Sequence, residues 1–139
     1  MTQHFDAACF EHGTAVAPAR RDRGRRAFLS GAAAEERAID AYRQKGLTLL
    51  AHRWRGQSGE IDLILKDAST YVFAEVKKAA SLDAAIARLR PAQMRRIHLA
   101  ASEFLGGTPD GQLSDVRFDL VVMDGAGALA ILPEAFSHF

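Results

Sequence analysis

The sequence predicts a single small α/β domain of the α+β kind, in which helices cover a mixed sheet. The chain has 139 residues, a length at which one domain buries about two thirds of the surface that its unfolded chain exposes. Apolar residues recur first with helical spacing, then with strand-like alternation, then with helical spacing again and in two final strand-like runs. The resulting order αβββαββ, with antiparallel strands followed by a crossover helix, predicts the mixed sheet.

Residues 1–27 are expected to form a flexible basic extension, and residues 28–139 the domain. Apolar positions in the first segment show no period, and the segment is rich in Ala, Arg and His. Its arginine cluster, residues 20–26, contains one acid, Asp22. Such runs are usually solvated surface, so this cluster gains weight only beside an independent signal for phosphate binding.

The first helix is expected over residues 31–45, because its apolar side chains have helical spacing. Ser30 is a plausible N-cap, and Gly46 favours the conformation that ends a helix. A strand over residues 47–51 should follow, leading into a polar, glycine-containing segment at 53–59.

Two further strands are expected over residues 61–65 and 71–77, and they should form a hairpin across the turn at 66–70. If this hairpin closes symmetrically, Asp62 lies directly opposite Glu75.

The second half of the chain is expected to contain two helices and two strands. Ser81 can cap a short helix, and Pro91 suits the first position of a longer helix that ends at Gly106. Strands are expected over residues 116–123 and 128–132. The longer helix should bury a stripe of four side chains, which are Met94, Ile97, Ala101 and Phe104.

Paired carboxylates in the central hairpin are the strongest chemical signal. Glu75 and Lys77 lie on one face of their strand because they are two residues apart, and Asp62 should face Glu75 at about 5 Å. Two like charges at that separation repel unless a cation lies between them, and magnesium prefers carboxylate and water oxygens. The alternative is a set of exposed ion pairs, with Glu60 facing Lys77. Phe73 shares the face of the acids, so this face is at least partly covered.

Glu35 adds a third acid on the inward stripe of the first helix, in step with Ala38, Ile39 and Tyr42. Two interpretations remain open for it. The carboxylate either favours the positive N-terminal end of the helix or acts as a further metal ligand, directly or through water.

The order of the motifs resembles the YraN-like family of small bacterial proteins, which is similar to archaeal Holliday-junction resolvases within the PD-(D/E)xK nuclease superfamily. The resemblance runs from about residue 31 to residue 122. Its specific parts are Gly-Glu-Ile-Asp at 59–62 and Glu-Val-Lys at 75–77, supported by the segments at 31–38, 53–55 and 117–121.

The resemblance implies a restriction-endonuclease-like core and a metal-dependent endonuclease acting on DNA. It makes Asp62 and Glu75 metal ligands, Lys77 the group that assists the attacking water, and Glu35 an accessory catalytic acid and metal ligand. The implied cofactor is Mg²⁺, with Mn²⁺ as a substitute. Branched or structured DNA in repair or recombination is the expected substrate, and a homodimer would suit the symmetry of a four-way junction.

The sequence departs from the family pattern at three positions. Arg53 replaces a usual Asn, Ala79 follows the lysine where a polar residue is common, and Gln93 stands where a Lys is common. These changes affect substrate contacts more than the metal ligands. A catalytically inactive module that binds nucleic acid or a protein partner is therefore the alternative function.

Residues on either side of the acids are candidates for nucleic-acid binding. Trp54 lies between Arg53 and Arg55, where its ring either stacks on a base or simply belongs to the core. Gln93, Arg95 and Arg96 in the longer helix could follow a DNA backbone without reading its sequence.

Other classes of site and location find little support in the sequence. Cys9 is the single cysteine, so an internal disulfide is excluded, and its neighbours lack zinc-ligand spacing. No apolar run approaches the roughly 20 residues that span a membrane, and no secretory signal begins the chain. The expectation is a cytoplasmic protein without membrane contact.

Overall fold

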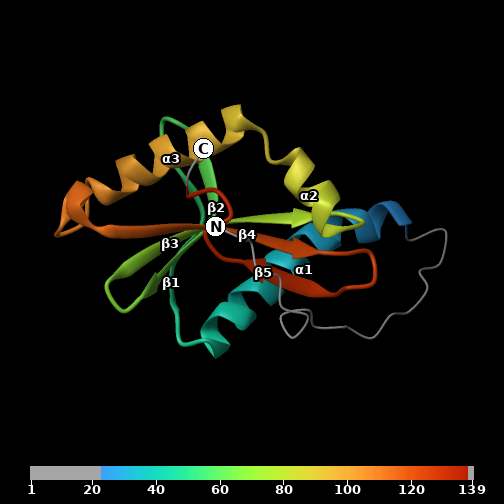
Figure 1. Cartoon of the computed structure of the whole chain (residues 1–139). Helices are drawn as coiled ribbons and strands as arrows, with labels where there is room; N and C mark the ends of the chain where they lie inside the picture. The colour runs from blue at the N-terminus through green and yellow to red at the C-terminus, as the bar shows by residue number, and fades with distance from the viewer. Residues whose placement is uncertain (1–22, 138–139) are drawn as a thin grey trace.

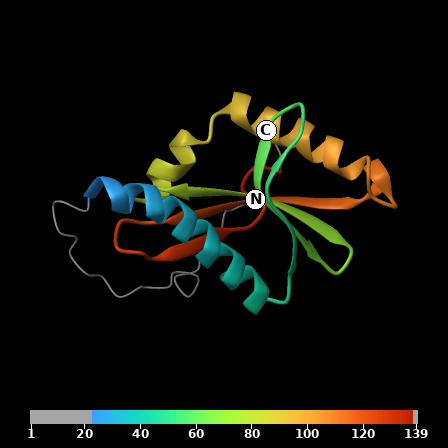
Figure 2. The same ribbon diagram turned by 180° about the vertical axis from the view of Figure 1, so that it is seen from behind.

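The structure of the chain is a computed structural model that describes residues 23–137, with side chains from residue 31 onward. A mixed five-stranded sheet in the order β1-β2-β3-β4-β5 forms its centre. Helices α2 and α3 lie on one face of this sheet and α1 on the other, as the two opposite views show (Figures 1 and 2). The predicted α+β class and mixed sheet are therefore confirmed.

Helix α1 (Arg23–Gln44) begins earlier than predicted. Ser30 lies inside the helix and does not cap it, because arginine and alanine, which are strong helix formers, continue the helix on both sides of the apparent cap signal. Gly46 ends the helix as expected, with a φ of 92° that favours glycine. Residues 1–22 of the predicted extension lie outside the described part of the chain.

Strands β1 (Thr48–Arg55), β2 (Glu60–Asp67) and β3 (Thr70–Lys78) form an antiparallel meander. The predicted hairpin register is confirmed from Asp67 opposite Thr70 to Leu63 opposite Ala74. The first strand was predicted to end at residue 51 but continues to Arg55, because Trp54 and Arg55, at the start of the polar segment, pair with β2. Polarity alone did not mark a loop here, since β1 is an edge strand whose side chains are largely exposed.

The crossover from β3 to the parallel strand β4 (Asp115–Met123) runs through α2 (Leu82–Arg88), α3 (Pro91–Leu105) and the short helix η3 (Gly111–Leu113). Strand β5 (Leu129–Leu132) then pairs antiparallel with β4. The predicted roles of Ser81 and Pro91 are confirmed. The Ala84 amide donates to Ser81 Oγ at 3.1 Å, and Pro91 is the first residue of α3.

Two apolar cores, one on each face of the sheet, hold the three layers together. The core under α2 and α3 contains Phe73, Ile97 and Phe118, and the core under α1 contains Ala38, Val72 and other aliphatic side chains. The predicted stripe of α3 packs into the first core. Strand β3 is paired on both sides and buried from Tyr71 to Glu75, and its partly exposed polar end carries the candidate site.

Candidate functional site

Asp62 and Glu75 meet where β2 and β3 separate, on the face of the sheet that α3 covers. The ladder between the two strands ends at Leu63 opposite Ala74, one step before the predicted pair of Asp62 and Glu75, so this pairing stays a prediction to which the confirmed register leads. Asp62 Oδ2 instead accepts a hydrogen bond from the backbone N–H of Val76 at 2.9 Å. The carboxylate thus takes the place of a strand partner, and this contact fixes Asp62 beside Glu75.

Burial makes this acid pair electrostatically unusual. Glu75 is 7% exposed, and its pKa is raised to about 8 by burial and by the neighbouring charge of Asp62. Burial also raises the pKa of Asp62, although the hydrogen bonds from Val76 and Glu75 oppose this rise. Glu75 is therefore the group that holds a proton at neutral pH, and the ionised Asp62 accepts a hydrogen bond from it.

Lys77 and Gln93 complete the surroundings of Glu75. The Nζ atom of Lys77 lies 3.4 Å from Glu75 Oε2, and the side-chain amide of Gln93 on α3 donates to the same oxygen at 2.6 Å. The predicted alternative, an ion pair between Lys77 and Glu60, is wrong, since Glu60 contacts Arg55 at 3.2 Å. Gln93, which we predicted to contact nucleic acid, contacts the acid pair itself.

Glu35 reaches the same end of the sheet from α1. Its Oε1 atom lies 2.6 Å from Nε2 of His52 and 2.9 Å from Nε of Arg53. Its charge still helps to raise the pKa of Asp62, so the third acid is near the pair. Within residues 23–137, no three side chains of His, Cys, Asp or Glu form a ready metal cage, and a ligand role for Glu35 stays a prediction.

The residues predicted to bind nucleic acid have mixed surroundings. Trp54 packs edge-on against Phe104 of α3 with ring centroids 5.6 Å apart, which supports its place in the core. Arg53 and Arg55 are more than half exposed at 54% and 79% of their side chains. Their guanidinium groups contact Glu35 and Glu60, respectively.

Arg95 and Arg96 lie on the exposed side of α3, as expected, and neither forms an ion pair with any other residue that the structure describes. A Cβ atom at Gly59 would lie 3.7 Å from Cβ of Arg96. The loop between β1 and β2 therefore lies directly beside Arg96. This loop leads into β2, which carries Asp62.

Sequence reasoning missed two contacts of this site. His52 has no recognisable ligand spacing in the sequence. Its contact with Glu35 forms only because α1 packs on β1. Glu103 on α3 accepts hydrogen bonds from the backbone amides of Gln57 at 3.0 Å and Ser58 at 3.3 Å. A glutamate on an exposed helix face carries no sequence signal for such a contact.

The donor set suits a hard divalent cation. Two carboxylates that share one proton carry more negative charge than their apolar surroundings favour, and a cation could replace that proton. Magnesium is usually held by one or two protein carboxylates together with water and substrate oxygens. Asp62 and Glu75 provide this number of ligands, and no third protein ligand is needed.

Fold and site together define a class: an α+β domain compatible with a restriction-endonuclease-like core, with an acid pair and a lysine at the end of its central hairpin. The model of the uncharacterised protein family UPF0102 matches residues 34–123. The chain belongs to this family, which is the YraN-like family that its motifs resemble.

Proteins of the same family from several bacteria are similar to almost the whole chain. A UPF0102 protein of Ruegeria sp. (strain TM1040) is 52% identical over 118 residues, which cover 85% of this chain and 95% of that protein. Relatives from Dinoroseobacter shibae and Roseobacter denitrificans are 50% and 45% identical and cover 84% and 86% of this chain, and 87% and 93% of their own lengths. Among the described residues, no helix has the length and apolar character needed to cross a membrane.

Proposed function

We propose that this chain is a magnesium-dependent endonuclease that hydrolyses phosphodiester bonds in DNA. The observation that carries the proposal is the pair of the half-buried Asp62 and the buried Glu75, with the ammonium group of Lys77 at 3.4 Å from Glu75. An acid pair in which burial raises both pKa values, with that of Glu75 at about 8, and which lies beside a lysine is characteristic of sites that perform chemistry. The junction-resolvase likeness of the family favours branched or structured DNA as the substrate.

Asp62 and Glu75 would hold the metal, for which manganese could substitute. When bound, this ion would polarise the phosphate and lower the pKa of a water molecule. Lys77 contributes a positive charge that stabilises the developing negative charge of the attacked phosphate. Gln93 orients the carboxyl group of Glu75 through its short hydrogen bond of 2.6 Å.

Exposed arginines support a contact with the DNA backbone. Arg96 lies beside the loop that leads to Asp62, Arg95 is its exposed neighbour on α3, and Arg53 and Arg55 belong to the neighbouring strand. Guanidinium groups bind phosphate oxygens without reading base sequence. This arrangement favours recognition of the shape of DNA, with an affinity that falls as the salt concentration rises.

The test compares cleavage of labelled single-stranded, duplex, flapped and four-way-junction DNA in magnesium or manganese. Asp62→Asn and Lys77→Ala should each lower the cleavage rate by at least about a hundredfold, as expected when transition-state charge loses its stabilisation. Asp40→Asn, an exposed substitution of the same chemical kind on α1, should cleave at the wild-type rate. All variants are purified by the same procedure, so that a contaminating nuclease would be recognised as cleavage that no substitution lowers.

Binding is measured in parallel in calcium or EDTA. Asp62→Asn should keep the DNA affinity of the wild type while losing cleavage. Salt-sensitive binding with no cleavage in either metal would overturn the proposal and identify an inactive nucleic-acid-binding module. Absence of both binding and cleavage at low salt would leave only a partner-binding role.

A further inference from the structure

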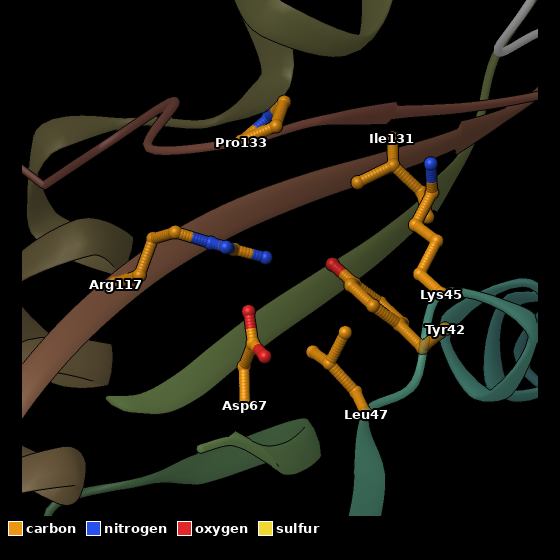
Figure 3. A pocket seen from close by; sticks show the side chains of 7 residues that line it. All are labelled: Tyr42, Lys45, Leu47, Asp67, Arg117, Ile131 and Pro133. Carbon is orange, nitrogen blue, oxygen red and sulfur yellow. The ribbon is translucent and has the colours of Figure 1, made fainter. Parts of the chain in front are cut away.

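A cavity of about 190 Å³ opens on the α1 side of the sheet, away from the acid pair. Tyr42, Leu47 and Ile131 in its wall belong to the core under α1, whereas Phe73, which shares the strand face of Glu75, belongs to the core under α3. The cavity is therefore separate from the candidate nuclease site. Its lining consists of seven side chains, shown in Figure 3: Tyr42, Lys45, Leu47, Asp67, Arg117, Ile131 and Pro133.

Arg117 is held rigidly in the wall of this cavity by a fully buried carboxylate. Asp119 is 0% exposed and accepts two hydrogen bonds from Arg117, both at 2.9 Å. The hydroxyl of Tyr42 donates to Asp119 at 2.8 Å, and the backbone N–H of Glu134 donates at 3.0 Å. Since Asp119 engages Nε and Nη2 of Arg117, the Nη1 group is left for a ligand, and Figure 3 shows the guanidinium end directed into the cavity.

Two further charges face the cavity from opposite sides. Figure 3 shows the carboxylate of Asp67 beside the guanidinium of Arg117, and the ammonium of Lys45 across the opening. Among residues 23–137, neither Lys45 nor Asp67 forms an ion pair within 4.0 Å. Because Asp119 offsets the charge of Arg117, the four charged groups sum to zero. The two charges that remain are the positive Lys45 on one side of the cavity and the negative Asp67 on the other.

We propose that this cavity binds a small zwitterion, a molecule with a carboxylate and an ammonium group close together and a short apolar substituent, as in a free α-amino acid. Lys45 and Arg117 would bind its carboxylate, and Asp67 its ammonium group. Leu47 and Ile131 would contact the apolar part.

Size and charge exclude the main rivals. The cavity is smaller than the roughly 300 to 1,000 Å³ of sites for drug-sized ligands, so a nucleotide would not fit within it. A phosphate or another small polyanion would be repelled by Asp67, whereas a zwitterion satisfies both sides at once. The proposal does not depend on nuclease activity.

The experiment titrates the ¹⁵N-labelled full chain with leucine and with two fragments of the same skeleton. These are 4-methylpentanoate, which lacks the ammonium group, and isopentylamine, which lacks the carboxylate. Leucine should shift the amide signals of Leu47, Arg117 and Ile131 saturably and bind at least about tenfold more tightly than either fragment, since each charged hydrogen bond contributes this much.

Substitutions make the two sides of the cavity separately testable. Lys45→Met and Asp67→Asn should each weaken leucine binding about tenfold, whereas Asp67→Asn should strengthen binding of 4-methylpentanoate by removing a repulsion. Arg43→Met, on the exposed last turn of α1, should leave all affinities unchanged, as should Asp62→Asn in the nuclease site. Urea unfolding midpoints establish that every variant is folded.

Two results would overturn the proposal. The first is the absence of saturable shifts at Leu47 and Ile131 with leucine at tens of millimolar. The second is equal binding of leucine and 4-methylpentanoate, with no effect of Asp67→Asn, which would identify a simple anion site.

Discussion

Glu75 is the side chain whose protonation most directly links stability to function. Its pKa is raised to about 8 from an ordinary value of 4.5, first by burial and then by the charge of Asp62. In the unfolded chain the same carboxyl ionises near its ordinary value. Between these two pKa values the native state binds one proton more than the unfolded state, so the native state loses stability as the pH rises.

We predict that the free energy of unfolding of the wild type, relative to Glu75→Gln, falls as the pH rises from about 4.5 to 8. The slope should be no more than roughly 1.4 kcal/mol per pH unit, because one proton is involved. The stability that the protonated Glu75 carboxyl contributes is fully present below pH 4.5, and it is lost as the pH rises through the pKa of Glu75 in the folded protein, about 8. Urea unfolding in EDTA measures it. Glu36→Gln, at an exposed position of α1, should instead give a curve parallel to the wild type.

The charged triad could be predicted from the sequence because hairpin alternation fixes which side chains share a face. Asp62, Glu75 and Lys77 follow from that rule. The contact of Gln93 with Glu75 could not be predicted, since it depends on the rotation of α3 over the sheet and not on any local pattern. The same holds for His52, which meets Glu35 only through the packing of α1 on β1.

Arg53 shows how a backbone conformation can explain a departure from the family pattern. Its φ is 54°, in the left-handed region where Asn is enriched and most other side chains are rare. The Asn that the family resemblance implies at this position would suit this backbone directly. Here an arginine adopts the same conformation, and its guanidinium contacts Glu35 at 2.9 Å.

At the scale of elements, the loop between β1 and β2 is fixed on α3. Glu103 accepts hydrogen bonds from the amides of Gln57 and Ser58 at the turn. A Cβ atom at Gly56 would lie 2.5 Å from Glu103 Oε1, so the loop packs too closely for any other residue there without a shift. Since β2 begins at Glu60, these hydrogen bonds position the strand that carries Asp62, a proposed metal ligand.

We predict that Glu103→Ala loosens this loop and slows cleavage without unfolding the domain. Hydrogen exchange of the Gln57 and Ser58 amides should accelerate about tenfold, as expected for the loss of hydrogen bonds to a charged acceptor. The free energy of unfolding should change by less than about 1 kcal/mol, because the contact is exposed. Hydrogen exchange followed by NMR and the cleavage rate at saturating DNA measure the two effects.

Matched variants separate positioning from general damage. Glu103→Gln keeps a side-chain acceptor and should restore most of the amide protection. Ser102→Ala removes the neighbouring contact with Gln112 on η3 and should leave the loop amides unchanged. Unchanged hydrogen exchange at the Gln57 and Ser58 amides in Glu103→Ala would contradict the proposal that Glu103 fixes this loop on α3.

Most elements could be predicted because their signals are local. Pro91 at the start of α3 and Ser81 before α2 act through their own backbone and side-chain geometry. The start of α1 and the end of β1 could not, since they depend on competition between weak local signals and pairing or packing. Ser30 could have capped a helix, but the helix continues through it.

On the scale of the whole molecule, Asp119 links three separate parts of the chain. It receives hydrogen bonds from Tyr42 on α1, from Arg117 on β4 and from the backbone of Glu134 after β5. Sequence periodicity predicted the strand around Asp119 but not its complete burial. The partners of a buried carboxylate are set by the packing of layers, here between residues that are 77 positions apart.

This network should contribute measurably to global stability through the Tyr42 hydroxyl. Burial and then the charge of Asp119 raise the pKa of Tyr42 well above its ordinary range, so the hydroxyl stays a neutral donor at any working pH. We predict that Tyr42→Phe lowers the free energy of unfolding by about 1 to 3 kcal/mol, because a buried carboxylate loses one of its donors. Equilibrium unfolding in urea measures the change.

Tyr71→Phe is the matched control, because Tyr71 is 7% exposed and its hydroxyl makes no hydrogen bond with another described residue. It should cost less than about 0.5 kcal/mol, the change expected away from any specific interaction. Equal losses in the two variants would mean that the hydrogen bond from the Tyr42 hydroxyl to Asp119 adds no stability beyond that of an unpaired hydroxyl. A larger loss in Tyr42→Phe would show that the buried carboxylate joins α1 to the sheet, so that the layer carrying Glu35 and the strands carrying the acid pair unfold together.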